Sequence, residues 1–193
     1  MHTLFVTDGI VLLKRGVGEA NVQAVILTEK LGLVRALARS ARAEKSKLRY
    51  GLEPLSCGTF SLIRGKYEWR LVGAGQVSGA YLAPVAGSRR TAARATRLLL
   101  RLINGEDPMP ALYQTVLRGL AALAQAKTQE QEDALECVLV LRILSHLGYL
   151  PKTPELSPFV VSDEFGVELA ARALKARAAL VRTINESLGA TGL

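Results

Sequence analysis

Six cationic side chains crowd into residues 35–49, and a single acid, Glu44, lies among them. The cations are Arg35, Arg39, Arg42, Lys45, Lys47 and Arg49. Like charges repel one another, so such a cluster lowers folding stability unless an anion binds to it. Guanidinium and ammonium groups on one surface can neutralise successive phosphates of a nucleic acid, and each contact releases about one counterion. The cluster therefore predicts a phosphate-binding surface; a solvated surface whose charges oppose aggregation is the alternative.

A second cationic cluster lies on the helix predicted from Ser88 to Ile103. At about 100° per residue, four arginines of this helix fall within about 60° of one another. They are Arg90, Arg94, Arg97 and Arg101. No acid occurs between Glu68 and Glu106, so these arginines lack local partners. We expect them to join the first cluster in one electropositive track, with a solvated helix face as the alternative.

The net charge of +8 is unevenly distributed along the 193 residues. Residues 1–80 hold 12 Lys and Arg against 6 Asp and Glu, whereas residues 127–193 hold 7 against 9. This asymmetry favours a polyanionic partner for the N-terminal part. A membrane surface and an acidic protein are the other partners compatible with it.

The residue types that commonly perform catalysis are sparse and scattered. Cys57 and Cys137 stand far apart without a neighbouring His or Cys at ligand spacing, which predicts buried free thiols and no metal site. His2 lies at an end of the chain that is expected to fray, and His146 falls in the last turn of a predicted helix, where an imidazole suits the helix dipole. The glycines of residues 73–79 lack the Lys-Ser/Thr that a phosphate-binding loop requires. We expect a protein that is not an enzyme and carries no cofactor.

The first 78 residues are predicted to form five short strands separated by turn signals. The strand segments are Leu4–Leu13, Val22–Leu27, Leu33–Ala38, Leu55–Ile63 and Tyr67–Val77. Arg35 and Arg39 fall on one face of the third segment, and the residues that follow leave the strand pattern as a loop. Five strands in so short a segment are typical of a small barrel or sandwich, which we place at residues 1–78.

From residue 79 onward the apolar period becomes helical, which predicts an all-α domain over residues 79–193. Ser88 is expected to cap the first helix, and Asp107-Pro108 to begin the second. Thr128 with Gln131 forms a capping box for the third helix, and Gly148 ends it. A last helix is predicted from Ser162 or Asp163 to about Leu188.

The apolar segments are too short to cross a membrane. Arg142 interrupts the longest candidate, and no run reaches the roughly 18 residues that a spanning helix needs. The N-terminal segment carries its cations after its apolar residues, unlike a secretory signal. We expect a globular protein in the cytoplasm.

Two segments resemble the RecO family of DNA repair and recombination mediators. Residues 7–55 are similar to the N-terminal domain of that family, and residues 134–151 are similar to a helix that ends in Gly-Tyr-x-Pro. The matching pieces of the first segment are Asp8-Gly9-Ile10-Val11-Leu12, Gly18-Glu19, Thr28-Glu29-Lys30-Leu31-Gly32, Ala38-Arg39 and Lys45-Ser46-Lys47-Leu48 before Pro54. The resemblance spans most of the chain in the same order.

This resemblance implies an α+β multidomain protein: an N-terminal five-stranded OB-fold barrel followed by an all-α helical domain. It implies binding of single- and double-stranded DNA, annealing of complementary strands and help in recombinase loading. The implied protein partners are RecR and the acidic, apolar C-terminal tail of single-strand DNA-binding protein. Arg39, Arg42, Lys45 and Lys47 fall in the part of the family that binds DNA.

The chain departs from many RecO relatives after the Gly-Tyr-x-Pro turn. Those relatives carry a four-cysteine zinc module there, whereas residues 152–163 of this chain contain no cysteine. We therefore expect no zinc. The short connection also leaves open whether the helical domain still binds partner proteins.

The aromatic content of 5% limits how this protein can hold a single strand. Sequence-tolerant binders gain roughly 1–3 kcal/mol per base from aromatic stacking. Of the candidate platforms Phe60, Tyr67 and Trp69, at least half are expected in the barrel core. Binding should therefore depend mainly on phosphates and fall steeply with salt. An RNA-binding OB module and an adaptor for an acidic protein tail are the competing interpretations.

Overall fold

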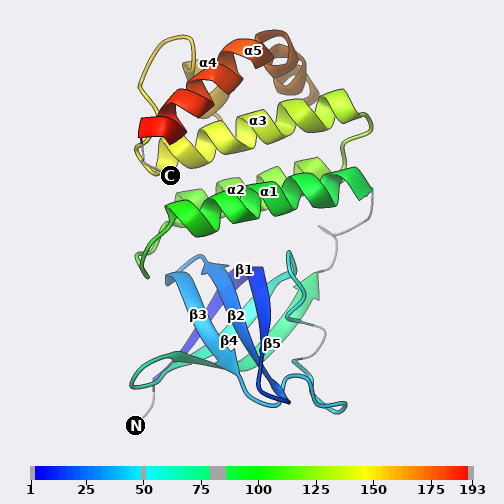
Figure 1. Cartoon of the computed structure of the whole chain (residues 1–193), viewed down its shortest axis with the longest axis vertical. Helices are drawn as coiled ribbons and strands as arrows, with labels where there is room; N and C mark the ends of the chain where they lie inside the picture. Colours follow the sequence, from blue (N-terminus) through cyan, green and yellow to red (C-terminus); the bar gives the residue numbers. More distant parts are fainter. Residues whose placement is uncertain (1–2, 49–50, 79–85, 191–193) are drawn as a thin grey trace. The chain divides into compact units, whose positions relative to one another are not determined.

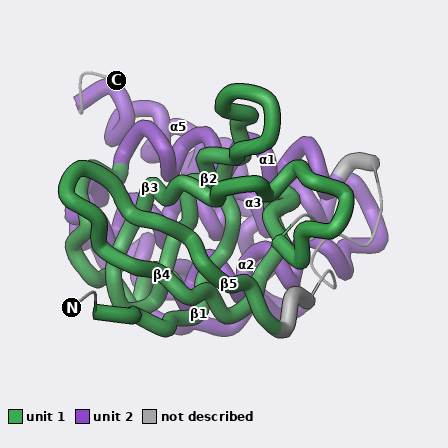
Figure 2. The backbone as a smooth tube through the Cα atoms, turned by 90° about the horizontal axis from the view of Figure 1, so that it is seen from below, with its two compact units in different colours: residues 1–83, 103–113 green, residues 84–102, 114–193 purple. Residues whose placement is uncertain are grey.

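The structure is a computed structural model that describes residues 3–48, 51–78 and 86–190, without the side chains of residues 76–78 and 86–87. The chain divides into two compact units (Figure 2). Unit 1 comprises residues 1–83 and 103–113, and unit 2 comprises residues 84–102 and 114–193.

Unit 1 contains a closed five-stranded barrel (Figure 1). Its strands are β1 (Leu4–Val17), β2 (Asn21–Thr28), β3 (Gly32–Ala38), β4 (Cys57–Arg64) and β5 (Trp69–Ser78). They are arranged in the order β1-β2-β3-β5-β4, and every neighbouring pair is antiparallel except β3 and β5. The five predicted strands are confirmed, and the barrel prevails over the sandwich that the sequence also allowed.

The long strand β1 closes the barrel because it pairs with two different neighbours. Residues 4–10 of β1 pair with β4, and residues 9–17 pair with β2. A register shift between Val11 and Leu13 marks an irregularity in the β1–β2 pairing, and such a bulge bends a strand. Val34, Ala36 and Ala38 of β3 point into the buried core together with Phe60 and Trp69. Small residues on β3 leave room for these large aromatic rings.

The helices of the chain are α1 (Ala86–Leu102), α2 (Pro110–Ala124), α3 (Gln129–His146), α4 (Ser157–Val160) and α5 (Val167–Ala190). Within unit 2, α3 is the central element and contacts α1, α4 and α5. The predicted apolar face of α2 is buried, with Leu112, Val116, Leu120 and Leu123 each at most 4% exposed. None of the described helices combines the length and the apolar character that a membrane span requires.

The predicted signals at the ends of α3 are confirmed. The Thr128 side chain accepts a hydrogen bond from the Gln131 amide at 3.2 Å, as a capping residue does. At the other end Gly148 has a φ of +77°, the left-handed conformation that a residue without a side chain adopts without strain. These two residues fix where the central helix of unit 2 begins and ends.

Three predicted helix starts are wrong. The second helix, α2, begins at Pro110 rather than at Asp107-Pro108. Ser88 does not precede α1, because the helix already begins at Ala86 and Ser88 is buried in its first turn. The last helix begins at Val167 rather than at Ser162 or Asp163, because the Ser162 hydroxyl accepts a hydrogen bond from the Glu164 amide within a local turn. The short helix α4 before this turn was not predicted.

A buried arginine holds the connection between α4 and α5 against α3. Arg142 is 1% exposed, its Nε donates to the Phe159 carbonyl at 2.8 Å, and its Nη2 donates to the Glu164 carbonyl at 3.0 Å. Its guanidinium carbon lies 4.3 Å from the centre of the Phe165 ring. Burial lowers the pKa of Arg142 from its usual high value. One side chain of α3 thus satisfies backbone groups at both ends of the connection.

Candidate nucleic-acid interface

The strand pairing of the barrel brings arginines from three strands onto one outer face. Arg15 of β1 pairs with Gln23 of β2, Gln23 pairs with Leu37 of β3, and Leu37 pairs with Arg70 of β5. Adjacent strands are about 4.8 Å apart, so this row spans roughly 15 Å. Because Ala36 and Ala38 point into the core, their neighbour Leu37 points outward, and so does the rest of its row.

Two further arginines flank this row along β3. Arg35 lies two residues before Leu37, and Arg39 follows directly after the end of β3. Both side chains are exposed, as is Arg15, whereas Arg70 is half-buried. We call Arg15, Arg35, Arg39 and Arg70 the arginine face. None of these four side chains forms an ion pair within the part of the chain that the structure describes.

Exposed aliphatic side chains lie among these arginines. Leu13 of β1, in the same cross-strand row as Arg35, is 46% exposed, and Val72, two residues after Arg70 on β5, is 47% exposed. Cations contact phosphates, and apolar groups contact bases or sugars without reading their sequence. A nucleic-acid strand of any base sequence can therefore lie across this face.

Three other predicted cations, Arg42, Lys45 and Lys47, follow in the segment after β3 and belong to none of its paired rows. Lys45 and Lys47 are exposed in the turns that follow β3, and Arg49 lies outside the described residues. Arg42 donates from its Nη1 to the Gly18 carbonyl at 3.3 Å. Sequence reasoning missed Arg15 and Arg70. Arg15 lies beyond the predicted end of the first strand at Leu13, and the parallel pairing that brings Arg70 beside β3 has no local signal.

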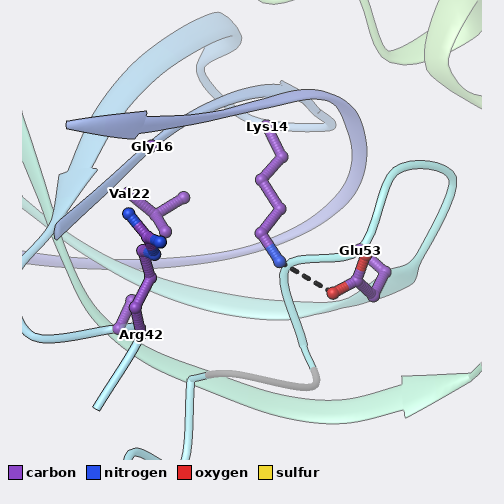
Figure 3. Close-up of a pocket in the computed structure, with 6 residues that line it drawn as sticks. Lys14, Gly16, Val22, Arg42 and Glu53 are labelled. Carbon is purple, nitrogen blue, oxygen red and sulfur yellow. Dashed lines mark hydrogen bonds and ion pairs between the residues drawn. The ribbon is translucent and has the colours of Figure 1, made fainter. Parts of the chain in front are cut away.

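Arg42 instead lines a pocket at one end of the barrel (Figure 3). This barrel-end pocket has a volume of about 560 Å³ and is lined by Lys14, Gly16, Val22, Ala41, Arg42 and Glu53. Val22 and Ala41 belong to the buried core of the barrel, so they form an apolar wall. The Lys14 ammonium donates to the Glu53 carboxylate at 2.7 Å.

Two of the three candidate aromatic platforms are unavailable for stacking on bases. Phe60 is fully buried and Trp69 is 5% exposed within the barrel core, which confirms that at least half of the three candidates are core residues. Tyr67 is 88% exposed and lies beneath the Lys66 ammonium, 5.0 Å from its ring centre. Arg64 lies over the Trp69 ring and forms an ion pair with Glu106.

The four arginines predicted to form a ridge on α1 are all exposed, opposite the buried Ala95, Leu99 and Leu102. The expectation that the ridge is not neutralised is wrong for Arg94. Its Nε and Nη2 donate to the two Glu136 carboxylate oxygens of α3 at 2.7 and 2.6 Å. Arg90, Arg97 and Arg101 form no ion pair among the described residues. The acid that neutralises an arginine of one helix can therefore come from a helix far away in the sequence. A search for pairs within the same helix does not detect it.

The ion pair predicts that Arg94 and Arg97 contribute differently to DNA binding. Arg97→Gln should weaken binding of single-stranded DNA about fivefold at 0.1 M salt through loss of one phosphate contact. Arg94→Gln should weaken it less than about twofold, because its guanidinium is already occupied, and should lower the stability by about 1 kcal/mol. Fluorescence anisotropy and urea unfolding measure the two effects. Equal losses of DNA affinity would show that Glu136 does not occupy Arg94 in solution.

The two cysteine thiols are buried. Burial raises the pKa of the Cys57 thiol to about 12 and that of the Cys137 thiol to about 11, so both stay protonated at neutral pH. His146 lies 2.8 Å from the Thr115 hydroxyl, but Thr115 is fully buried and burial lowers the pKa of the imidazole. In the described parts of the chain, no group of three or more His, Cys, Asp or Glu side chains is placed to hold a metal ion.

Two family models match the chain in the order of its elements. The model described as "Recombination protein O N terminal" matches residues 1–70, which include β1 to β4. The model described as "Recombination protein O C terminal" matches residues 91–155, which include most of α1, all of α2 and all of α3. The arginine face and the barrel-end pocket both lie within the first match.

Curated relatives named "DNA repair protein RecO" are similar over most of the chain. The Streptomyces avermitilis protein is 34% identical over 160 residues, which cover 77% of this chain and 63% of the relative. The Bifidobacterium adolescentis protein is 30% identical over 165 residues, which cover 83% of this chain and 65% of the relative. The Acetivibrio thermocellus protein is 30% identical, over 75% of this chain and 57% of the relative. The chain thus spans less than two thirds of the length of these relatives, and it belongs to the RecO family.

Proposed function

We propose that this protein is a DNA-binding recombination mediator without catalytic activity. It binds single- and double-stranded DNA mainly through phosphates, promotes annealing of complementary strands and assists recombinase loading during recombinational repair. The names of the curated relatives, which are DNA repair proteins, support the repair context. The arginine face supports the mode of binding.

The single observation that carries this proposal is the alignment of three arginines on β1, β3 and β5, with Arg39 directly after β3, without carboxylate partners among the described residues. Unneutralised guanidinium groups repel one another, so they favour a bound polyanion. Because aromatic platforms are scarce, the surface holds phosphates more firmly than bases. A surface that screens phosphate repulsion and leaves the bases accessible favours pairing of two strands.

A pocket of unit 2 supports binding of an acidic, apolar protein tail, as in the partner tail of single-strand DNA-binding protein. The pocket has a volume of about 570 Å³, and its apolar lining includes Leu150, Pro151, Leu156 and Val161. Val161 is 77% exposed, and Lys152 is the cation among the lining residues. An apolar pocket with one cation suits a short peptide that ends in aliphatic residues and a carboxylate. RecR is the second protein partner in this proposal.

Equilibrium binding at several salt concentrations tests the proposed function. Labelled single-stranded and duplex DNA should both bind, with an affinity that falls steeply and linearly on a log-log plot of affinity against salt. Unlabelled DNA, structured RNA and an acidic tail peptide then serve as competitors for the labelled single strand.

The outcomes separate the three interpretations. If unlabelled DNA displaces the labelled single strand at least as readily as structured RNA does, the result supports the proposal that the protein is a DNA-binding mediator. Much stronger displacement by structured RNA would favour an RNA-binding module instead. If the tail peptide binds and neither nucleic acid does, the protein is an adaptor and the DNA proposal is wrong.

A further inference from the structure

We propose that the barrel-end pocket binds the terminal phosphate monoester of a nucleic-acid strand, with Arg42 and Lys14 as its two cationic groups. The inference rests on the proposed function, since it concerns the terminal phosphate of a bound nucleic-acid strand. Both side chains line one pocket of about 560 Å³, a volume within the range of small-ligand sites. Figure 3 shows that they come from different segments and flank the same space.

The arrangement of Arg42 leaves its guanidinium available to a ligand. One hydrogen bond, from Nη1 to the Gly18 carbonyl at 3.3 Å, orients the group, and no carboxylate pairs with it among the described residues. Gly16 lies in front of it: a Cβ at this position would come within 3.3 Å of Nη1. The remaining donors of the planar guanidinium suit two oxygens of one phosphate.

The wall of the pocket favours a strand end over the middle of a strand. Val22 and Ala41 close one side because they belong to the barrel core. A phosphodiester inside the pocket must continue in both directions, whereas a terminal phosphate continues in only one. A monoester also carries about 1.5 to 2 negative charges at neutral pH, against one for a diester, and so gains more from two nearby cations.

Glu53 occupies one of the two cations when no ligand is bound. Its carboxylate accepts from the Lys14 ammonium at 2.7 Å, while about half of the Glu53 side chain remains exposed. A carboxylate is the side-chain group most similar to a phosphate oxygen pair, so Glu53 competes with the incoming anion for Lys14. Removing its charge should therefore strengthen binding, which sets it apart from a residue that merely supports the fold.

Anisotropy titrations with four versions of one oligonucleotide test the inference at constant ionic strength. The versions carry a 5′-phosphate, a 3′-phosphate, both or neither, and inorganic phosphate serves as a free competitor. The wild-type protein should bind at least one phosphorylated end about tenfold more tightly than the unphosphorylated strand. The phosphorylated version that binds more tightly than the unphosphorylated one identifies which end of the strand the pocket accepts.

The variants assign this preference to the pocket. Arg42→Gln and Lys14→Met should each reduce the tenfold preference to about twofold or less, and Glu53→Gln should increase it by about a further threefold. Arg182→Gln and Lys175→Met, which remove exposed cations of α5, are the matched controls and should leave the preference unchanged.

Each remaining outcome contradicts the inference. Equal binding of all four oligonucleotides by the wild-type protein would show that the pocket takes no terminal phosphate, although DNA binding itself would stand. Absence of binding to every version would overturn the proposed function together with the inference. A preference that persists in Arg42→Gln, or that falls in Glu53→Gln, would place the phosphate elsewhere.

Discussion

Replacing Arg142 by Ala will lower the free energy of unfolding by about 3–5 kcal/mol. The substitution leaves the Phe159 and Glu164 carbonyls without their donors and removes the cation that lies over the Phe165 ring. It also opens a cavity, since Arg142 is among the largest fully buried side chains. Urea unfolding followed by circular dichroism measures the loss.

A second substitution separates the lost hydrogen bonds from the lost volume. Arg142→Met keeps most of the buried volume and removes the donors together with the cation over the Phe165 ring, so it should cost about 2 kcal/mol. Arg182→Met, at an exposed position of α5, should stay within about 0.5 kcal/mol of the wild type. If Arg142→Met has the same free energy of unfolding as the wild type, the hydrogen bonds from the guanidinium to the two carbonyls do not stabilise the fold, and the proposed role of Arg142 is wrong.

Replacing all four residues of the arginine face by Gln will weaken binding of single-stranded DNA by roughly 500-fold at 0.1 M salt. Each phosphate contact contributes about 0.7 to the slope of log affinity against log salt for a single strand, so four contacts contribute about 3. The slope of this variant should therefore be flatter by about 3. Stability should change little, because three of the four side chains are exposed and none is in an ion pair among the described residues.

A matched variant distinguishes a local surface from the total charge of the protein. Replacing Arg172, Lys175 and Arg182 by Gln removes a similar charge from an exposed side of α5. This variant should bind DNA within about threefold of the wild type, because the account assigns the phosphate contacts to the arginine face and none of them to these three residues. Comparable losses in the two variants would mean that net charge, rather than the arginine face, governs binding.

The strands of the barrel were predictable because side-chain alternation is a local property. From Val34 to Ala38 the side chains alternate between buried and at least partly exposed, and β3 covers the predicted segment Leu33–Ala38 plus Gly32. The extent of β1 was underestimated, because the residues directly after Leu13, Lys14 and Arg15, are charged and carry no apolar signal. Pairing with β2 keeps them in the strand, and pairing depends on residues elsewhere in the chain.

The candidate site was only partly predictable for the same reason. Arg35 and Arg39 could be placed on one face from β3 alone, but Arg70 joins them through the parallel pairing of β3 with β5. The ion pair of Arg94 with Glu136 depends on the packing of α1 against α3. Arg142 looked like an interruption of an apolar run, and only the carbonyls of the α4–α5 connection explain its burial. Contacts between segments far apart in the sequence determine where these arginines lie and what they bind. Sequence periodicity reports only on local structure.

The annealing rate of two complementary oligonucleotides tests the central claim most directly, since that claim assigns strand binding to the arginine face. Rates are compared for the wild-type protein, the arginine-face variant and the matched α5 variant at 0.05 to 0.2 M salt. The wild-type protein and the α5 variant should accelerate annealing, and the arginine-face variant should be slower by about tenfold or more at unchanged stability. Annealing by the arginine-face variant at the wild-type rate would contradict the account.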